Sequence, residues 1–382
     1  MRWLIPQKSL LKRCCANHLV HLMCYCCVNI DYLKDLENQN IPAETDGQAS
    51  SRKEDHITLA FASSTPATGL DDRFYYEPLL SGHKSTAPSV EIKVGNKMMQ
   101  HPIWVSSMTG GTEKAMTINH NLAKLCGTYG LGMGLGSCRQ LLYEDKRLEE
   151  FNVRPLMPGS PLFINLGIAQ IETLIERGET ELILRLINRL DADGLIIHVN
   201  PLQEWLQPEG DRFLIPPIDT ITTLLASADY PIIVKEVGQG FGKNSLSKLL
   251  SLPLEAIDLA GYGGTNFSKL ELLRSDTLKH ENLKPICFLG HTCEEMIAHI
   301  NAYSRAGKEI NCNKVIISGG IKNFLDGYYH MQRCTLPSIY AQASGFLKYA
   351  MDYSELEKFC QIQIEGLKMA NAFLTLKSSK TT

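Results

Sequence analysis

Short apolar runs alternate with segments of helical periodicity through most of this 382-residue chain. In 169–190, for example, apolar residues recur every three or four positions, which predicts amphipathic helix. Strands that alternate with helices in this way predict parallel βαβ units. The strand candidates are 102–107, 130–137, 161–167, 194–200, 231–238, 256–264, 285–290, 314–320 and 338–345.

The number and the ends of these runs favour a closed barrel. Eight strand–helix units close a barrel of about 250 residues, so one candidate is surplus, and 285–290 is the weakest. An open, doubly wound sheet is the alternative, but such a sheet uses mainly the point where its strand order reverses, whereas barrel enzymes use the ends of many strands. We therefore predict an α/β fold, a (β/α)8 barrel over 102–376. The polar residues that end successive runs are Ser107, Ser137, Asn165, His198, Lys235, Thr265 and Ser318.

Two segments precede the predicted barrel. We expect a leader over 1–48, which is either disordered or the result of a start codon placed too far upstream, and an N-terminal arm with lead-in over 49–101. The stretch 37–56 is polar, contains Pro, Gly and Ser, and predicts a linker. Arg52 and Lys53 then belong either to a solvated linker or to an arm that folds over the barrel and clamps an anionic ligand.

Bulk composition excludes some classes of protein. The 38 basic and 41 acidic residues give a net charge of -3, so a nucleic acid partner has no support and an anionic ligand needs local groups. No run approaches the roughly 18–20 apolar residues of a membrane helix, and the best candidate, Leu19–Ile30, lacks a cleavage site. Five of the twelve cysteines cluster in the leader without a zinc-site spacing, and the others are scattered as reduced thiols would be. We expect a cytoplasmic protein without membrane or nucleic acid partners.

Three motifs near the early strands are weak when each is taken alone. In "VSSMTGGT" (105–112), small residues let backbone N–H groups approach an anion or a ring, although Gly-Gly turns also occur without function. Arg139 in "GLGSCRQ" suits a phosphate, or else pairs with the acidic stretch 143–150. The amide of Asn165 can bind a heterocycle, or can simply form a turn.

The later motifs carry a stronger prediction. Lys235 ends an apolar strand, so it faces a negative charge or loses its proton. Glu236 is the obvious partner, but adjacent strand residues point to opposite faces, so one of the two faces the barrel axis. Two glycine-rich stretches, 260–267 and 318–322, follow late strands, where barrel loops commonly hold a ligand phosphate.

The stretch "HVNPLQE" (198–204) places four hydrogen-bonding side chains where a core strand ends. We expect Pro201 to break the strand and turn them toward the barrel mouth. Glu204 is a hard oxygen donor suited to Mg²⁺, which is held by one or two carboxylates and by phosphate oxygens of a ligand. Gln203 and His198 are placed to contact the reacting end of that ligand. The alternative is a capped turn with a solvated glutamate.

In this order the motifs resemble those of the type 2 isopentenyl diphosphate isomerases, which are FMN-dependent (β/α)8 enzymes. The resemblance covers roughly residues 50–375. It is carried by "RKEDH" (52–56), "SSMTGG" (106–111), "GLGSCR" (134–139), "NLG" (165–167), "HVNPLQE" (198–204), "VKEVG" (234–238), "AGYGGT" (260–265) and "SGGIK" (318–322).

The resemblance implies an isomerase of isoprene biosynthesis that interconverts isopentenyl and dimethylallyl diphosphate by a 1,3-allylic proton shift. It implies reduced FMN, Mg²⁺, NADPH as the reductant, and a homo-oligomer, tetramer or larger. The implied FMN contacts are Ser107, Met108, Thr109, Ser137, Asn165, Lys235, Thr265, Gly319 and Gly320. The implied substrate contacts are Arg52, Lys53, Ser137, Cys138, Arg139 and Gln203, with Glu204 as the metal ligand and Gln203 and His198 as catalytic residues.

The physical chemistry of the residues agrees with this division of roles. An anionic reduced flavin supplies the counter-charge that a buried Lys235 needs. The reacting hydrocarbon has no acidic proton and no side chain is an obvious acid or base, so N5 of the flavin is the expected proton donor. Gln203 would then position the allyl end.

The chain departs from the family at three places. Cys138 stands where the family usually has glutamine, and Asn266 and Phe267 where it usually has tryptophan. The turn "ALGA", expected to help hold the FMN phosphate, falls on "CTLPS" (334–338), which has a proline and no glycine. The nearby "AQASG" (341–345) is the expected replacement.

Two other functions compete. An FMN-dependent oxidoreductase of the 2-hydroxy-acid oxidase type needs a histidine base and a late arginine at a strand end, and "SGGIK" is followed by no such pair. A non-catalytic flavin or prenyl-phosphate binding protein would keep the phosphate contacts but has no need of Gln203 and Glu204.

Overall fold

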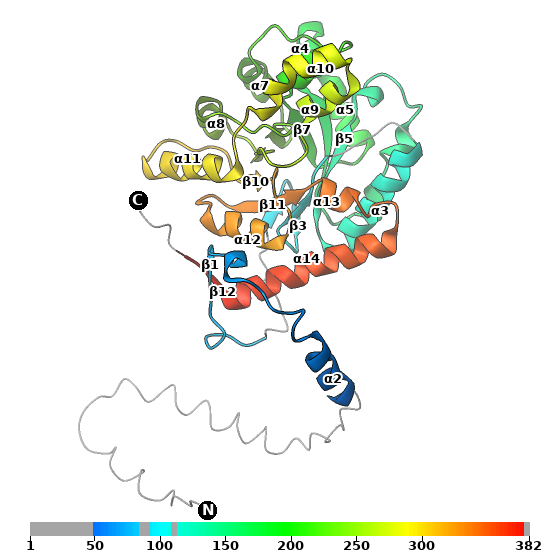
Figure 1. Ribbon diagram of the computed structural model, residues 1–382. Helices are drawn as coiled ribbons and strands as arrows, with labels where there is room; N and C mark the ends of the chain where they lie inside the picture. The colour runs from blue at the N-terminus through cyan, green and yellow to red at the C-terminus, as the bar shows by residue number, and fades with distance from the viewer. Residues whose placement is uncertain (1–48, 84–91, 108–112, 378–382) are drawn as a thin grey trace, which may run out of the picture. The chain divides into compact units, whose positions relative to one another are not determined.

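A computed structural model describes residues 49–83, 92–107 and 113–377 (Figure 1). The chain divides into two units, Met1–Leu70 and Asp71–Thr382. The predicted leader lies outside the described residues, and the first unit contains helix α2 (Ala49–Leu59) and the 3-10 turn η1 (Ala67–Gly69). The linker prediction is therefore wrong for the part of 37–56 that α2 occupies. Arginine, lysine and glutamate are strong helix formers, and α2 contains neither glycine nor proline.

The second unit contains a closed barrel of eight parallel strands, with helices between them, and this confirms the predicted (β/α)8 fold (Figure 1). Around the barrel the strands follow one another in chain order, and the last closes against the first. The strands are β4 (Ile103–Val105), β5 (Gly132–Ser137), β6 (Leu162–Gly167), β7 (Gly194–His198), β8 (Ile232–Lys235), β9 (Ala256–Asp258), β10 (Val315–Ile317) and β11 (Ser338–Gln342).

The surplus strand candidate is 285–290, as its weak pattern indicated. Its residues form the 3-10 turn η5 (Lys284–Phe288), with Pro285 at the start. Proline has no N–H group to donate to a ladder and has a fixed φ that suits the first turn of a helix. The proline therefore directs this apolar run into a turn.

Helices fill the connections between the strands. The predicted helix 169–190 is in fact two helices, because Gly178 ends the first with a left-handed φ of 66°. The helices of the barrel unit are α3 (Glu113–Tyr129), α4 (Ile168–Arg177), α5 (Glu181–Arg189), α6 (Pro201–Leu206), α7 (Pro217–Leu225), α8 (Lys243–Leu250), α9 (Phe267–Arg274), α10 (Thr277–Leu283), α11 (Cys293–Arg305), α12 (Phe324–Arg333), α13 (Ser344–Leu347) and α14 (Tyr353–Phe373). The short 3-10 turns are η2 (Arg139–Leu141), η3 (Leu148–Glu150) and η4 (Arg154–Leu156).

The inside of the barrel is a packed apolar core around Trp104. This side chain is fully buried and meets Phe163 edge to face, with ring centroids 5.9 Å apart. A Cβ on Gly132 would lie 2.2 Å from the Trp104 ring, so alanine at this position would clash with it. The apolar core members are Val94, Met99, Trp104, Phe163, Ile196, Ile233, Ala256, Ile316, Ile339 and Ala341.

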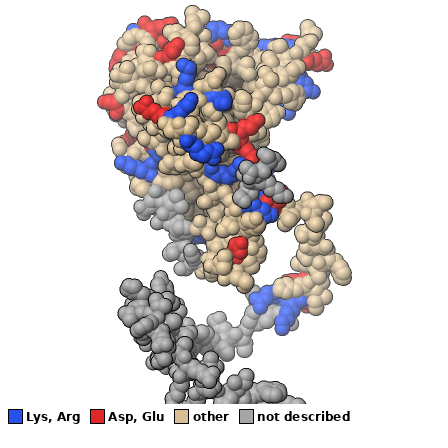
Figure 2. Space-filling view, turned by 90° about the vertical axis from the view of Figure 1, so that its left-hand side faces the viewer, with Lys and Arg blue, Asp and Glu red and all other residues tan. Residues whose placement is uncertain are grey.

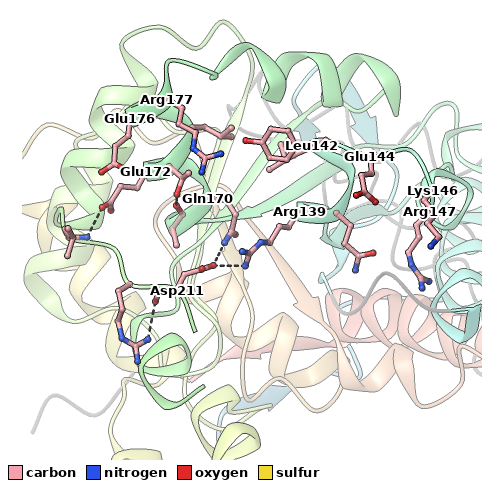
Figure 3. A pocket seen from close by; sticks show the side chains of 17 residues that line it. Arg139, Leu142, Glu144, Lys146, Arg147, Gln170, Glu172, Glu176, Arg177 and Asp211 are labelled. Atoms are coloured by element: carbon pink, nitrogen blue, oxygen red, sulfur yellow. Dashed lines mark hydrogen bonds and ion pairs between the residues drawn. The ribbon is translucent and has the colours of Figure 1, made fainter. Parts of the chain in front are cut away.

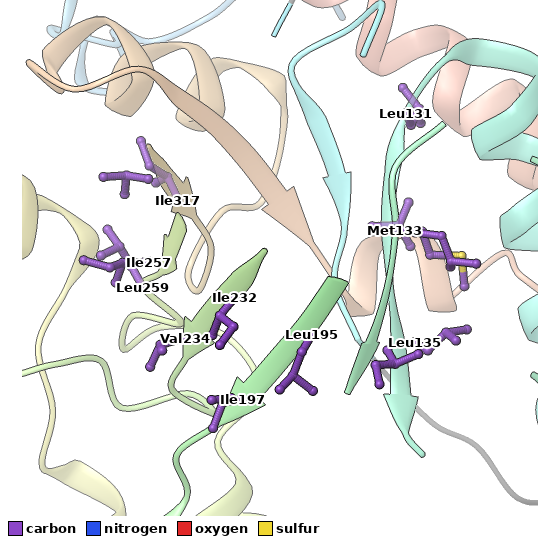
Figure 4. Packing of buried hydrophobic residues seen from close by; sticks show 14 of the residues in the cluster. Leu131, Met133, Leu135, Leu195, Ile197, Ile232, Val234, Ile257, Leu259 and Ile317 are labelled. Carbon is purple, nitrogen blue, oxygen red and sulfur yellow. The ribbon is translucent and has the colours of Figure 1, made fainter. Parts of the chain in front are cut away.

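A second core lies between the barrel and its helices. Alternate strand residues, such as Ile232 and Val234 on β8, point outward into this layer (Figure 4). Residues alternate between the two faces of a strand, and here each face packs on a core. Each barrel strand is therefore apolar on both faces, which explains the continuous apolar runs of the sequence. The two cores together fix which residues point into the barrel.

Among the described residues, four short strands lie outside the barrel. β2 (Ile92–Val94) and β3 (Lys97–Met99) form an antiparallel hairpin whose Val94 and Met99 join the inner core. β1 (Phe74–Tyr76) pairs antiparallel with β12 (Leu374–Leu376). None of the helices in the described part of the chain has both the length and the apolar character needed to cross a membrane.

Candidate functional site

Four barrel strands carry a polar side chain on the inward face, two positions after an inward apolar one, and Ser318 has the same spacing directly after β10. Residues two apart on a strand share a face. The pairs are Phe163 and Asn165, Ile196 and His198, Ile233 and Lys235, Ala256 and Asp258, and Ile316 and Ser318. The apolar inside of the barrel therefore ends in a polar layer at the C-terminal strand ends. We call Asn165, His198, Lys235, Asp258 and Ser318 the mouth layer.

Lys235 lies at the centre of the mouth layer. The residue is 8% exposed, and its Nζ donates a hydrogen bond of 2.6 Å to the backbone oxygen of Glu236. In the strand register it stands beside His198 on β7 and Asp258 on β9. Of the two neighbours Lys235 and Glu236, the lysine is therefore the one that faces inward, with the backbone oxygen of Glu236 as its hydrogen-bond acceptor.

Asp258 is a member of the mouth layer that the sequence analysis missed. It is 1% exposed, and the hydroxyl of Ser318 donates to its carboxylate. Burial raises the pKa of Asp258, and the charge of Lys235 partly counters that effect. An aspartate inside the apolar run "AIDLA" was the available signal, because an aspartate is almost never fully buried without a partner.

Glu236 organises the loop that follows β8. Its carboxylate accepts backbone hydrogen bonds from Gly238 at 2.7 Å, Gln239 at 2.5 Å and Gly240 at 2.9 Å. Burial raises the pKa of Glu236, and these three N–H groups act in the opposite direction. Lys235 thus faces the inside of the barrel, whereas Glu236 holds the loop that follows β8.

The residues of "HVNPLQE" surround the start of α6. Pro201 is the first residue of that helix, as expected of a proline that ends a strand. Asn200 donates from Nδ2 to Glu204 at 2.9 Å and to Gln203 at 3.2 Å, while its Oδ1 is buried without a partner among the described residues. Nε2 of Gln203 donates to Glu271 at 3.2 Å. The turn therefore holds Gln203 and Glu204 close together.

Glu271 is a second residue that the sequence analysis missed. It lies on α9, is 4% exposed, and also accepts hydrogen bonds from Gln207 at 2.7 Å and Arg274 at 2.6 Å. Its sequence neighbourhood looks like any amphipathic helix, and it stands 68 residues from Gln203. Only the closed barrel brings the two together.

Arg139 reaches a partner that the sequence did not suggest. Its Nη1 lies 2.6 Å from Oδ2 of Asp211, and Gln170 donates to the same oxygen at 2.9 Å (Figure 3). The expected alternative, an ion pair with the acidic stretch 143–150, is therefore wrong. The backbone N–H of Asp211 donates to Glu204 at 2.7 Å, so the loop after α6 joins Arg139 to the predicted metal ligand. Arg139, Gln170 and Asp211 border an outer cavity of about 640 Å³ (Figure 3).

A cavity of about 370 Å³ is lined by Lys235 and Ser318 of the mouth layer, and we call it the mouth cavity. Five of the predicted cofactor contacts line it, namely Ser107, Lys235, Thr265, Gly319 and Gly320. The hydroxyls of Ser106 and Ser107 are buried without a hydrogen-bond partner among the described residues. Buried polar groups are normally paired, so these hydroxyls are suited to a polar ligand in the cavity.

Two glycine loops form one wall of this cavity. Gly319 has a φ of 88°, and a Cβ there would lie 2.0 Å from the backbone oxygen of Gly261. Gly263 has a φ of 119°, and its Cβ would lie 3.2 Å from Cα of Gly320. The loops after β9 and β10 can therefore touch only because they lack side chains.

The structure does not place every predicted site residue at this cavity. Met108 and Thr109 lie outside the described residues. Arg52 and Lys53 are exposed on α2, in the first unit. Cys138 is fully buried in the outer core, where burial raises the pKa of its thiol to about 12, so we leave it out of the proposed substrate site.

The remaining cofactor contacts stand on the strands β5 and β6. Ser137 is exposed at the end of β5, where it pairs in register with Asn165. Asn165 is buried and contacts His198 from the neighbouring strand. Both therefore lie at the strand ends that surround the mouth.

The expectation for "CTLPS" is wrong. This stretch precedes β11 and so lies at the N-terminal strand ends, where Leu336, Pro337 and Ser338 line a cavity of about 320 Å³ with Gln100 and His101. The stretch 341–345, in contrast, lines the mouth cavity. The departure at "CTLPS" therefore does not affect the mouth.

Charged side chains are mixed over the surface drawn in Figure 2, without a large field of one sign. In the described part of the chain, no three His, Cys, Asp or Glu residues are grouped to hold a metal ion. A cation at Glu204 would therefore need further oxygens from its ligand, which is the usual situation of Mg²⁺ with phosphates.

The chain is similar in sequence to curated isomerases. No protein-family model matches it. The isopentenyl-diphosphate delta-isomerase of Rickettsia africae (strain ESF-5) is 33% identical over 343 residues, which cover 87% of this chain and 94% of that protein. The enzyme of the same name from Rickettsia bellii (strain RML369-C) is 33% identical over 326 residues, which cover 83% of this chain and 91% of that protein.

Solved structures share the fold at much lower identity. A flavocytochrome b2 mutant with benzoylformate has 13% identity and a TM-score of 0.55, covering 81% of this chain and 78% of that one. A mandelate oxidase mutant with a monooxide FMN adduct has 12% identity and a TM-score of 0.50, covering 86% of this chain and all of that one. At such identities the likeness shows the barrel fold alone.

Proposed function

The chain belongs to the isopentenyl-diphosphate delta-isomerase family, and on this premise we propose that it interconverts isopentenyl and dimethylallyl diphosphate as a type 2, flavin-dependent enzyme. The reaction is a 1,3-allylic proton shift that uses reduced FMN and Mg²⁺. The observation that carries the proposal is the mouth cavity, where Lys235 and two glycine loops lie above the apolar inside of the barrel.

The residues of the cavity fit FMN. Ser106 and Ser107 offer unpaired hydroxyls, and the glycine loops let backbone N–H groups approach a ligand. Lys235 brings a positive charge to a site that suits an anionic ring. Two structural neighbours with this fold, a mandelate oxidase with an FMN adduct and the flavin-binding domain of flavocytochrome b2, support the choice of cofactor.

Two lysines that line the mouth cavity suit the phosphate of FMN. Lys322 follows the glycine pair of β10, and Lys348 follows the helix α13; both line the cavity. Ser344 and Gly345 line the same wall, at the place that replaces "CTLPS". Two ammonium groups with backbone N–H groups form a favourable phosphate site.

The diphosphate of the substrate would lie nearer the outer rim. Arg139 offers a guanidinium that a diphosphate can take over from Asp211, and Glu204 would hold Mg²⁺ together with substrate oxygens. Arg52 and Lys53 on α2 are the further cations of this proposal. The protein carries a net charge of -3, so these local cations are needed to bind the anionic substrate.

The side chains around Gln203 orient the allyl group. Gln203 is fixed by Asn200 on one side and by the buried carboxylate of Glu271 on the other. When bound, reduced FMN supplies the proton transfer that no isolated side chain offers to an unactivated alkene. Gln203 then holds the substrate against the cofactor, and the apolar barrel wall excludes water.

The oxidoreductase remains the second candidate, because the structural neighbours include a mandelate oxidase and a flavocytochrome b2 on the same fold. Against it, oxidation of a 2-hydroxy acid gives no role to the Gln203, Glu204 and Glu271 group. The two reactions differ in their products and can be separated directly.

An anaerobic assay tests the proposal. Full-length protein is incubated with FMN, NADPH, Mg²⁺ and isopentenyl diphosphate in D₂O, and dimethylallyl diphosphate is followed by proton NMR. The expected result is deuterium-labelled product that disappears when FMN or the reductant is omitted. A protein that binds flavin, forms no product and oxidises a 2-hydroxy acid would establish the second candidate instead.

A pair of glutamine variants tests the role of Gln203. Gln203→Ala is expected to lower kcat at saturating substrate, whereas Gln361→Ala, on α14, is expected to leave it unchanged. Full turnover by Gln203→Ala would remove the positioning role from the proposal.

The rest of the proposal concerns the assembly and the leader. We expect a cytoplasmic homo-oligomer, tetramer or larger, which light scattering after size-exclusion chromatography would reveal. Residues 1–48 are proposed to be dispensable, with the arm over 49–101 and the barrel over 102–376 as the working parts. Deletion of residues 1–45 should leave folding and flavin content unchanged, and loss of the folded protein would contradict this.

A further inference from the structure

Asn165 and His198 face each other across the neighbouring strands β6 and β7. Nδ1 of His198 lies 2.8 Å from Oδ1 of Asn165, at the level of the mouth layer. A distance of this length is a hydrogen bond, so one of the two atoms must carry a proton. Which atom carries it depends on how the Asn165 amide is oriented.

The orientation of Asn165 is fixed from its other side. Its Nδ2 donates to the backbone oxygen of Leu135 on β5 at 3.2 Å. A carbonyl oxygen can only accept, so the reversed amide would place two oxygens against each other. Oδ1 therefore faces His198 as an acceptor, and Nδ1 of His198 must be the donor.

The ring of His198 is neutral in this environment. Burial lowers the pKa of His198 to about 3, and the charge of Lys235 adds to this effect. Lys235 on β8 is the charged group beside the ring, while Asn165 on β6 is an uncharged amide. In a neutral imidazole with the proton on Nδ1, Nε2 carries a lone pair.

Nε2 is the other ring nitrogen of His198. It forms no hydrogen bond with any residue in the described part of the chain. Gly167 lies next to it, and a Cβ there would come within 2.9 Å of Nε2, so a larger residue would block this atom. A lone pair at Nε2 attracts an N–H or O–H group and repels a phosphate oxygen.

We propose that Asn165 is a positioning residue that fixes His198 as the neutral tautomer with the proton on Nδ1, so that Nε2 serves as a hydrogen-bond acceptor in the mouth. His198 is then not one of the cations that hold the diphosphate. It takes an N–H or O–H group of the bound cofactor or substrate, and this last assignment rests on the proposed function. The tautomer itself does not depend on that function.

The tautomer can be measured by nitrogen NMR on full-length protein labelled with ¹⁵N-histidine, without added substrate. The chain has 11 histidines, so His198→Gln identifies the signals of His198 by their loss. We expect His198 to show one tautomer, protonated at Nδ1, throughout pH 6–8. A wild-type spectrum with the proton on Nε2, or with imidazolium in this range, would overturn the proposal.

Two substitutions of Asn165 separate positioning from simple packing. Asn165→Leu has a similar volume but no acceptor, so both tautomers should appear in exchange. Asn165→Asp keeps the acceptor and adds a charge, so the Nδ1 proton should remain while the imidazolium signal appears at higher pH than in the wild type. An unchanged tautomer in folded Asn165→Leu protein would also overturn the proposal.

A control excludes a general effect of losing a hydrogen-bonded asparagine. Asn301 on α11 has the same bonding pattern, since its amide donates to Arg333 at 2.7 Å and accepts from Thr335 at 2.9 Å. Asn301→Leu should leave the His198 signals unchanged. If the isomerase assay fails but the NMR result holds, the proposed function is wrong and the positioning role stands.

Discussion

Lys235 and Asp258 stand in register on the neighbouring strands β8 and β9, and both side chains belong to the inward face of the barrel. Each is almost fully buried. Their opposite charges act on one another, because the charge of Lys235 lowers a pKa of Asp258 that burial raises. The lysine therefore partly offsets the effect of burial on this carboxyl group.

Replacing Lys235 by methionine should destabilise the protein in a pH-dependent way. Without the lysine, the pKa of Asp258 in the folded protein rises further above its value in the unfolded chain. The protein then keeps its stability at low pH, where Asp258 is protonated. It loses stability as the pH rises from the unfolded pKa toward the new folded pKa. We expect a small loss at pH 4 and a loss of about 2 kcal/mol or more at pH 7, because an unpaired charge is then buried. Chemical denaturation at both pH values measures the difference.

Lys314→Met is the matched control for Lys235. Lys314 is equally buried, but it pairs with Glu255 at the opposite ends of the strands. Its loss should also destabilise the fold while the FMN content of purified protein stays normal. Lys235→Met should lose bound FMN, and retention of full flavin content would contradict the role of Lys235 in the cofactor site.

His198 should make the protein less stable in mild acid. Its folded pKa is about 3, below the roughly 6.5 of an unfolded histidine, so the unfolded state binds the proton first. Stability is complete above about pH 6.5 and falls by about 2 kcal/mol on going to pH 5. The same titration with His198→Gln should lack this loss, and an identical pH profile would show that His198 is exposed to water.

Gly319→Ala should cost more stability than Gly307→Ala. Both residues have a positive φ, 88° and 66°, but a Cβ on Gly307 meets nothing within 4 Å. Gly307→Ala therefore measures the backbone strain alone, about 1–2 kcal/mol. Gly319→Ala adds the collision with Gly261 and should cost about 2 kcal/mol more.

The glycine pair also tests the cofactor site through FMN binding. Gly319→Ala should weaken FMN binding, whereas Gly307→Ala should not, because Gly307 follows α11 and does not line the mouth cavity. Fluorescence titration of FMN measures both variants. Equal affinities would place the flavin away from the glycine loops.

Arg139→Gln should raise the KM for isopentenyl diphosphate about tenfold or more, because a charged hydrogen bond to the diphosphate contributes about 1.5–3 kcal/mol. Turnover at saturation should change little, since the arginine binds the part of the substrate that does not react. Arg147→Gln is the control, because Arg147 borders the same outer cavity but pairs with Glu150. A KM change in both variants would indicate a general electrostatic effect.

The sequence predicted the barrel because apolar residues recur at different spacings in strands and in helices. Each of the eight barrel strands falls within one of the predicted apolar runs. From the alternation of side chains it predicted that one of Lys235 and Glu236 faces inward, and the structure shows that this residue is Lys235. It missed Asp258, although an aspartate inside an apolar run was a signal for a buried carboxyl group with a partner. Glu271 and Asp211 could not be found, because their contacts with Gln203 and Arg139 join segments 68 and 72 residues apart and exist only once the barrel has closed.

Two predictions from local sequence were wrong because the position in the folded barrel decides what a residue contacts. "CTLPS" lost its expected role because its loop precedes a strand, and in a barrel the loops before and after a strand lie at opposite ends. Cys138 follows the exposed Ser137, yet its side chain turns into the outer core. Two adjacent residues at a strand end thus face solvent and a dry core, respectively.

The pairing of β1 with β12 bears on how this chain can be rebuilt. Phe74 stands opposite Leu376 and Tyr76 opposite Leu374, so the first and last strands of the barrel unit leave their ladder at the same end. A short linker could join these two points without crossing the barrel. New chain ends could then be opened in the turn at Cys334–Ser338, which faces away from the mouth, and a circularly permuted barrel would keep its mouth layer intact.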